Sequence, residues 1–260
     1  MQMINPHCGV TRDTRGVVRL TISNAGSLTI LNSTVIRAVI EGLTTLSADA
    51  DIRALILSGG TEKSMIGGAD IKEMATLDQA SAERFISGLR DLCEAVRNFP
   101  APVIARMPGW CLGGGLEVAA ACDFRVAAAD AKFSMPEVRV GIPSVIHAAL
   151  LPRLIGWGRA RWLLMTAATI DAPTALDWGL VDVVAADGEP LDAAVERVVE
   201  MLLECGPQAL RNQKALLRQW EDLPLKESVE VSVGAFGRSY LTDEPRRLMQ
   251  EFLDRKRGGK

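Results

Sequence analysis

The chain has 260 residues, 48% of them hydrophobic and 23% charged, with a formal net charge of −3. This length allows one large domain with a substantial core, and the composition excludes disordered, collagen-like and disulfide-rich scaffold proteins. The slight negative charge argues against nucleic-acid binding, which requires a basic excess. Only two histidines occur, His7 and His147. Two histidines make a histidine-based zinc site or a Ser-His-Asp triad improbable, and we expect acid–base chemistry to use carboxylates.

Cysteine usage and the hydrophobic pattern indicate the compartment. The five cysteines are odd in number and contain no C-x-x-C pair, which favours a reducing environment. The first residues lack the basic and apolar regions of a signal peptide, and no run of eighteen apolar residues occurs. We therefore expect a cytoplasmic protein without a membrane partner or a metal site.

The first half of the chain alternates predicted strands and helices. Residues 16–23 alternate apolar and polar side chains, as in a half-buried strand, and residues 35–46 carry the apolar stripe of a helix. A short buried strand at 53–58, an amphipathic helix at 79–98 and another buried strand at 103–105 follow. This alternation predicts an α/β fold.

The last quarter of the chain is predicted to be helical. From about Leu191 to Arg257 the helical period dominates, with breaks at Gly206-Pro207 and Leu223-Pro224. We therefore divide the chain into an N-terminal tail (1–15), an α/β core (16–195) and a helical C-terminal region (196–260).

A triple glycine, Gly113-Gly114-Gly115, lies between an apolar strand and a predicted helix. Glycines there let the backbone approach a ligand and point amide hydrogens outward from a helix N-terminus. A tight turn without a ligand is an equally good interpretation of this motif alone. A dinucleotide fingerprint fails because Val118 occupies the third glycine position, and a P-loop fails because Glu62 precedes Lys63-Ser64.

A second loop, residues 64–74, also leads from a strand towards a helix and contains Gly67-Gly68-Ala69-Asp70. Taken alone, Asp70 is interpreted as a helix cap. Taken with the triple glycine, the loop indicates two strand ends whose exposed amides converge on one oxygen, as in an oxyanion hole.

Two glutamates accompany these loops. Glu117 follows the triple glycine, and Glu137 lies twenty residues later, after Pro136. Each alone is more often a surface or helix-dipole residue than a functional one. Their joint position beside a candidate oxyanion hole reverses that preference.

Four segments, residues 66–74, 108–123, 133–141 and 175–181, resemble successive signatures of the crotonase, or enoyl-CoA hydratase/isomerase, superfamily. The resemblance extends from about residue 16 to residue 257. It implies a spiral of ββα units followed by a helical trimerisation region, assembled as a homotrimer or a dimer of trimers.

The resemblance also implies an acyl-CoA thioester substrate, with no separate cofactor. The thioester oxygen would lie between the backbone amides of Ala69 and Gly114, which would polarise it. The adenine pocket of the family would correspond to the backbone of Gly68, Ala69, Asp70, Ile71 and Lys72.

Hydratases of the superfamily resemble this chain in having both glutamates. By that analogy, Glu117 would deprotonate the water that attacks C3, and Glu137 would protonate C2. Alternatives are double-bond isomerisation, decarboxylation or thioester hydrolysis within the superfamily, and a non-catalytic or RNA-binding relative outside catalysis. Both the retained glutamates and the negative charge argue against the last.

The segment after Glu137 departs from the family pattern. Ser144 occupies the place of a glycine that helps to hold the catalytic water in relatives. Pro143-Ser144 predicts a helix start capped by Ser144, with His147 at the third helical position. We consider two interpretations of His147: a residue at the surface or under a neighbouring subunit, or an imidazole that titrates near neutrality beside the two glutamates.

Overall fold

The structure is a computed structural model that describes the backbone of residues 1–258 and the side chains of residues 1–256. Its largest sheet has seven strands, in the order β1-β2-β3-β5-β8-β10-β13. The strands of this sheet are β1 (Gln2–Asn5), β2 (Cys8–Arg12), β3 (Val17–Ile22), β5 (Ala54–Gly59), β8 (Val103–Met107), β10 (Phe124–Ala127) and β13 (Val183–Val184). All pairs from β3 onward are parallel. These strands are rich in buried apolar residues, as expected for a parallel sheet covered on both faces.

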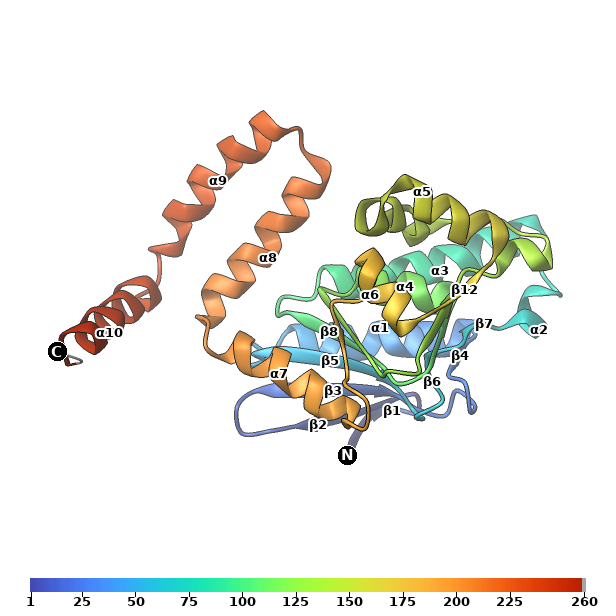
Figure 1. Cartoon of the computed structure of the whole chain (residues 1–260), viewed down its shortest axis with the longest axis horizontal. Helices are drawn as coiled ribbons and strands as arrows, with labels where there is room; N and C mark the ends of the chain where they lie inside the picture. The colour runs from blue at the N-terminus through green and yellow to red at the C-terminus, as the bar shows by residue number, and fades with distance from the viewer. Residues whose placement is uncertain (259–260) are drawn as a thin grey trace.

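A second sheet has four strands, in the order β12-β11-β9-β6, and a third pairs β4 with β7. Their bounds are β4 (Ile30–Leu31), β6 (Ser64–Ile66), β7 (Gly68–Ala69), β9 (Trp110–Leu112), β11 (Lys132–Ser134) and β12 (Thr169–Asp171). Successive chain units give one strand to the large sheet, at least one to a smaller sheet (β4 to the third, β6, β9 and β11 to the second), and then a helix (Figure 1). This arrangement confirms the expected spiral of ββα units.

The helices of the α/β body are α1 (Ser33–Ser47), α2 (Ile71–Met74), α3 (Gln79–Arg97), α4 (Gly114–Ala121), α5 (Leu151–Thr166) and α6 (Ala172–Trp178), with 3-10 helices η1 (Glu137–Val140) and η2 (Ile146–Leu150). Two of them, α1 and α3, form where apolar stripes predict them, and α4 follows the triple glycine as expected. The Asn32 side chain caps α1, and Asp78 forms a capping box with Ser81 at the start of α3. The stripes of α1 and α3 enter the main core together.

The helical C-terminal region is confirmed as α7 (Leu191–Leu203), α8 (Pro207–Asp222), α9 (Leu225–Ser239) and α10 (Glu244–Gly258). Helix α7 buries Val195 and Val199 in a second core cluster with Ile56 and Ile104 of the large sheet. The division at 195/196 therefore lies inside a helix that packs on the sheet as a unit. Figure 1 shows α9 and α10 projecting away from the α/β body.

Residues 1–15 were expected to be a tail, but most of them form strands. β1 and β2 make an antiparallel pair, and β2 pairs with β3 over five residues. The Cys8 side chain is fully buried in the main core, and this burial holds the strand in place. Among the described residues, none of the helices has the length and apolar character needed to cross a bilayer.

Candidate active site

A cavity of about 310 Å³ lies between the β7–α2 loop, α3, the N-terminus of α4, η1 and the segment before η2. Both Glu117 and Glu137 line it, and so do Ala69 and Gly114. Most of the remaining wall is apolar, with side chains from α2, α3, β9 and the η1–η2 segment: Ile71, Met74, Phe85, Ile86, Leu89, Leu112, Val140, Ile142 and Val145. An apolar pocket with a few convergent polar groups is the usual form of a small-molecule site.

The triple glycine lies in tight packing at one side of this cavity. Gly113 has a φ of +53°, which favours glycine, and a Cβ there would lie 2.5 Å from Oε1 of Glu137. A Cβ on Gly115 would lie 2.3 Å from the carbonyl oxygen of Ile66. The glycines therefore allow both the turn into α4 and the close approach of Glu137 to its backbone.

Ala69 and Gly114, whose backbone amides were predicted to form an oxyanion hole, both line the cavity. Gly114 is the first residue of α4, where N–H groups have no acceptor within the helix. At β7, the Asp70 N–H donates to the carbonyl of Leu31 at 2.9 Å. Because amides alternate in direction along a strand, the Ala69 N–H points away from β4. The two positions predicted from the glycine-rich loops therefore both lie at the cavity.

Glu117 lies in the first turn of α4 and is only 3% exposed. Its Oε1 accepts a hydrogen bond from the N–H of Ala148 at 3.0 Å. Burial raises the pKa of Glu117 to about 8, and the charge of Glu137 adds to the increase, whereas the amides of Ala148 and Val145 oppose it. The carboxyl group of Glu117 is therefore mostly protonated at neutral pH.

Glu137 begins η1, and its Oε2 accepts a hydrogen bond from the Ser144 hydroxyl at 2.8 Å. The prediction that Ser144 caps a helix is wrong. Helix η2 begins at Ile146, and its N-cap position is Val145, which makes no side-chain cap. The Ser144 hydroxyl bonds to a carboxylate instead, and hydrogen bonds to charged groups are the stronger ones.

His147 is 7% exposed and lies outside the cavity lining. Its Nε2 is 2.8 Å from Oε1 of Glu94 on α3, and burial lowers the pKa of the imidazole. The interpretation as a surface residue is therefore wrong within this chain, and the imidazole does not lie in the cavity that Glu117 and Glu137 line. The sequence carries no signal for this contact, because Glu94 lies 53 residues away.

The other predicted binding residues divide into two groups. Gly68 and Ile71 line the cavity. The Asp70 carboxylate caps α2 by accepting from the amides of Lys72 and Glu73, as the cap interpretation predicted. The Lys72 side chain is exposed on α2. Ser144 and Ala148, which contact the two glutamates, were not predicted to make these contacts.

Comparisons with known proteins agree with this geometry. The profile of the family described as Enoyl-CoA hydratase/isomerase matches residues 12–258. A relative named crotonyl-CoA hydratase, from Syntrophomonas wolfei, is 33% identical over 239 residues, which are 92% of each chain. A short-chain-enoyl-CoA hydratase from Clostridium acetobutylicum is 31% identical over 93% of this chain and 92% of its own. The crystal structure of an enoyl-CoA hydratase from Bacillus anthracis is similar with a TM-score of 0.90, at 30% identity over 96% of both chains.

Proposed function

Because the chain belongs to the enoyl-CoA hydratase/isomerase family, we propose that it adds water across the 2,3 double bond of an enoyl-CoA thioester, or catalyses the reverse dehydration. The observation that carries this proposal is that Glu117 and Glu137 line one largely apolar cavity together with Ala69 and Gly114 of the two glycine-rich loops. The relatives named crotonyl-CoA hydratase and short-chain-enoyl-CoA hydratase support a short acyl chain.

The amides of Ala69 and Gly114 would bind the thioester oxygen. Addition of a nucleophile at C3 places enolate-like negative charge on this oxygen, and preorganised donors stabilise it at no cost of reorganisation. The backbone at Gly68 and Ile71 would border the CoA portion of the substrate.

Glu117 and Glu137 would share the proton transfers. Hydration requires Glu117 ionised, so that it takes a proton from the attacking water, and Glu137 protonated, so that it delivers one to C2. Dehydration requires the opposite arrangement, with the single proton on Glu117 and with Glu137 ionised. Because burial raises the pKa of Glu117 to about 8, the pair keeps a proton at neutral pH. A group with a pKa near the working pH is also well suited to both acid and base roles.

A pH profile tests this shared proton. Hydration releases no net proton, so the pH dependence of kcat/KM must be the same in both directions. We expect a decline above about pH 8 in both, where Glu117 loses the remaining proton. A kcat/KM that stays constant up to about pH 9 would refute the one-proton scheme.

The proposed activity is tested by the loss of the conjugated thioester absorbance of crotonyl-CoA, with chromatography to identify the product. We expect Glu117→Gln and Glu137→Gln each to lower turnover by about 10²–10⁴, and Gly114→Pro to abolish it by removing an amide donor. The exposed Glu200→Gln on α7 serves as the control. An isomerised rather than hydrated product would assign the protein to a different reaction of the family.

We also propose a cytoplasmic homotrimer or dimer of trimers. One face of α9 presents exposed Leu225, Val229, Val233 and Phe236 at helical spacing, which suits contact with other subunits. The cysteines, all unpaired in the described part of the chain, suit a reducing compartment. Light scattering on the wild type and on Phe236→Glu tests the assembly; an unchanged trimer in the variant would place the interface elsewhere.

A further inference from the structure

Behind the active-site cavity, η2 is joined to α3 by a partly buried hydrogen bond, in which the imidazole is buried and the carboxylate is 46% exposed. The Nε2 atom of His147 lies 2.8 Å from Oε1 of Glu94. Helix α3 also carries Leu89, whose Cδ2 would lie 2.6 Å from a Cβ on Gly114. Helix α3 therefore contacts both the triple-glycine loop, through Leu89, and η2, through Glu94.

The surroundings of His147 assign its hydrogen atom. Nδ1 is buried and has no hydrogen-bond partner among the described residues. A proton on Nδ1 would be an unpaired buried donor, whereas a bare lone pair there is tolerated better. The neutral ring therefore carries its proton on Nε2 and donates it to Glu94. The lowered pKa of His147 agrees with this neutral form.

The peptide that follows His147 holds Glu117. The Ala148 N–H donates both to the carbonyl of Val145, at 2.9 Å, and to Oε1 of Glu117, at 3.0 Å. Ala148 is the residue directly after His147, so the position of the imidazole sets the position of this amide. A 3-10 helix of five residues has few bonds of its own to hold it in place.

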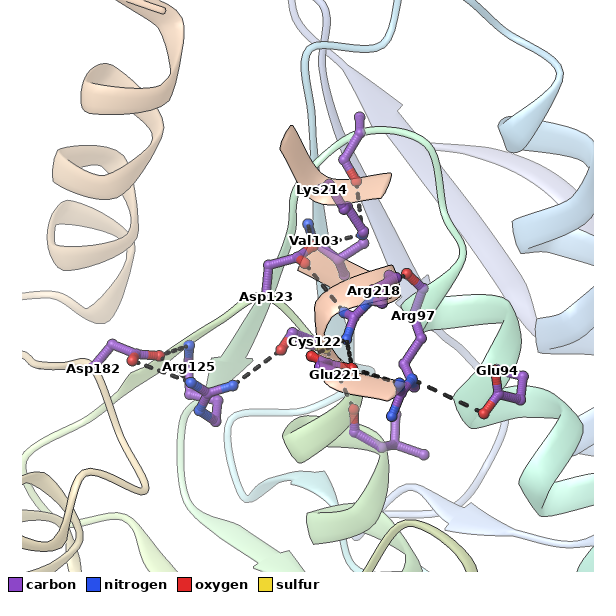
Figure 2. Close-up of polar contacts among 12 residues, drawn as sticks. Glu94, Arg97, Val103, Cys122, Asp123, Arg125, Asp182, Lys214, Arg218 and Glu221 are labelled. Atoms are coloured by element: carbon purple, nitrogen blue, oxygen red, sulfur yellow. Dashed lines mark hydrogen bonds and ion pairs between the residues drawn. The ribbon is translucent and has the colours of Figure 1, made fainter. Parts of the chain in front are cut away.

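Glu94 is in turn connected to the C-terminal region. Figure 2 shows the contacts that run from Glu94 through Arg97 to Glu221 and Arg218 of α8. Arg97 lies 3.9 Å from Glu94 and 2.6 Å from Glu221. Arg218 reaches Asp123, just beyond the C-terminal end of α4, at 3.3 Å. Helices α3 and α8 and the end of α4 are therefore cross-linked by side chains that lie outside the cavity lining.

We propose that His147 and Glu94 are positioning residues, which hold η2 so that the Ala148 amide stays on the carboxylate of Glu117. The proposal rests on the proposed function for its kinetic consequences, but its structural content does not depend on which substrate is used. Neither side chain touches the cavity.

The titratable and charged neighbours of Glu117 and His147 determine which group a change in the pH profile reports. Glu117 faces Glu137 of η1 and the thiol of Cys93 on α3, whose pKa is raised chiefly by burial and then by Glu117. His147 faces Glu94 and Arg97 of α3 and Arg218 of α8. Of these groups, only Glu117 accepts a hydrogen bond from the Ala148 N–H. Weakening that bond therefore raises the pKa of Glu117 directly.

The test compares His147→Leu with His147→Gln. Leucine removes the donor, whereas the amide nitrogen of glutamine can take the place of Nε2 and donate to Glu94. We expect His147→Leu to lower kcat about 10- to 100-fold with KM changed less than threefold, and His147→Gln to restore most of kcat. Loss of the Ala148 bond disfavours the ionised carboxylate, so the alkaline limit of kcat/KM should move to higher pH in the leucine variant. Glu94→Ala breaks the same bond and should reproduce these effects.

A second measurement needs no substrate. The infrared band of the protonated Glu117 carboxyl, identified by its absence in Glu117→Gln, is titrated in each variant. We expect its midpoint to rise in His147→Leu and to stay near the wild-type value in His147→Gln. This readout decides the positioning role even if the wild type fails to hydrate crotonyl-CoA, which would refute only the proposed function.

The matched control weakens a side-chain contact to a carboxylate elsewhere. Asp182→Asn weakens the contact with Arg125, which is 6% exposed and lies at the other end of the network in Figure 2. It should lower stability without altering kcat or the Glu117 titration. A wild-type kcat and titration in His147→Leu would overturn the proposal. So would an equal loss of kcat in Asp182→Asn, because that would indicate a general effect of destabilisation.

Discussion

Replacing Glu117 by glutamine should stabilise the protein increasingly as the pH rises, although it removes a proposed catalytic group. The folded protein raises the pKa of this carboxyl from 4.5 to about 8. Between these values the folded state holds a proton that the unfolded state releases, so the stability contributed by this group is complete below pH 4.5 and falls as the pH rises towards 8. Glutamine keeps the acceptor for the Ala148 amide but never ionises.

The magnitude follows from the size of the shift. One pKa unit corresponds to about 1.36 kcal/mol, so the stability contributed by Glu117 is lower than its low-pH value by about 2 kcal/mol at pH 6 and by about 5 kcal/mol at pH 9. The advantage of Glu117→Gln over the wild type should therefore grow by about 3 kcal/mol between these pH values. For a chain of this size, that difference corresponds to about 6–12 °C in the unfolding temperature.

The assay is thermal or urea unfolding of both proteins at pH 6, 7.5 and 9, at one protein concentration so that assembly contributes equally. The exposed Glu200→Gln controls for the loss of one negative charge and should remain parallel to the wild type. A stability difference between Glu117→Gln and the wild type that does not change with pH would refute the assignment of a raised pKa to this residue.

Three further substitutions test the surroundings of the site. Ser144→Ala removes the hydroxyl donor to Glu137 and should lower kcat about 3- to 10-fold with little change in stability; an unaltered kcat would show that the contact is dispensable. Gly113→Ala places a Cβ 2.5 Å from the Glu137 carboxylate at a φ of +53°, and turnover should fall at least about tenfold in a protein that keeps its circular dichroism spectrum. Lys214→Met removes the buried partner of Asp123 and should cost about 3 kcal/mol in urea unfolding, with kcat preserved; equal urea midpoints would contradict this.

The sequence predicts well those features that leave a periodic signal. The apolar stripes of α1 and α3 and the buried runs of β5 and β8 lie where expected, because a regular element repeats its pattern over several turns or strand residues. The two-residue strands β4 and β7 are too short to show any period. Pairing in β1 and β2 escaped prediction because it depends on β3 as a partner.

For the candidate site, local motifs identify the residues but not their contacts. The turn at the triple glycine and the Asp70 cap of α2 each involve only neighbouring residues, so both can be predicted from the sequence. The His147–Glu94 contact joins residues 53 apart. Burial of Glu117 likewise depends on η2 packing over α4, so the sequence could not show which glutamate has the raised pKa.

The pairing of Lys214 with Asp123 has a consequence for how the chain folds during synthesis. These residues are 91 positions apart, and the Lys214 ammonium group lies 2.6 Å from the carboxylate. When the last strands of the α/β body leave the ribosome, Asp123 still lacks this cation, because α8 has not yet been made. Domains generally fold as units, beginning from the N-terminus during synthesis. A nascent chain that stops after α7 should therefore hold an uncompensated carboxylate at the end of α4, and the body should reach full stability only after α8 emerges.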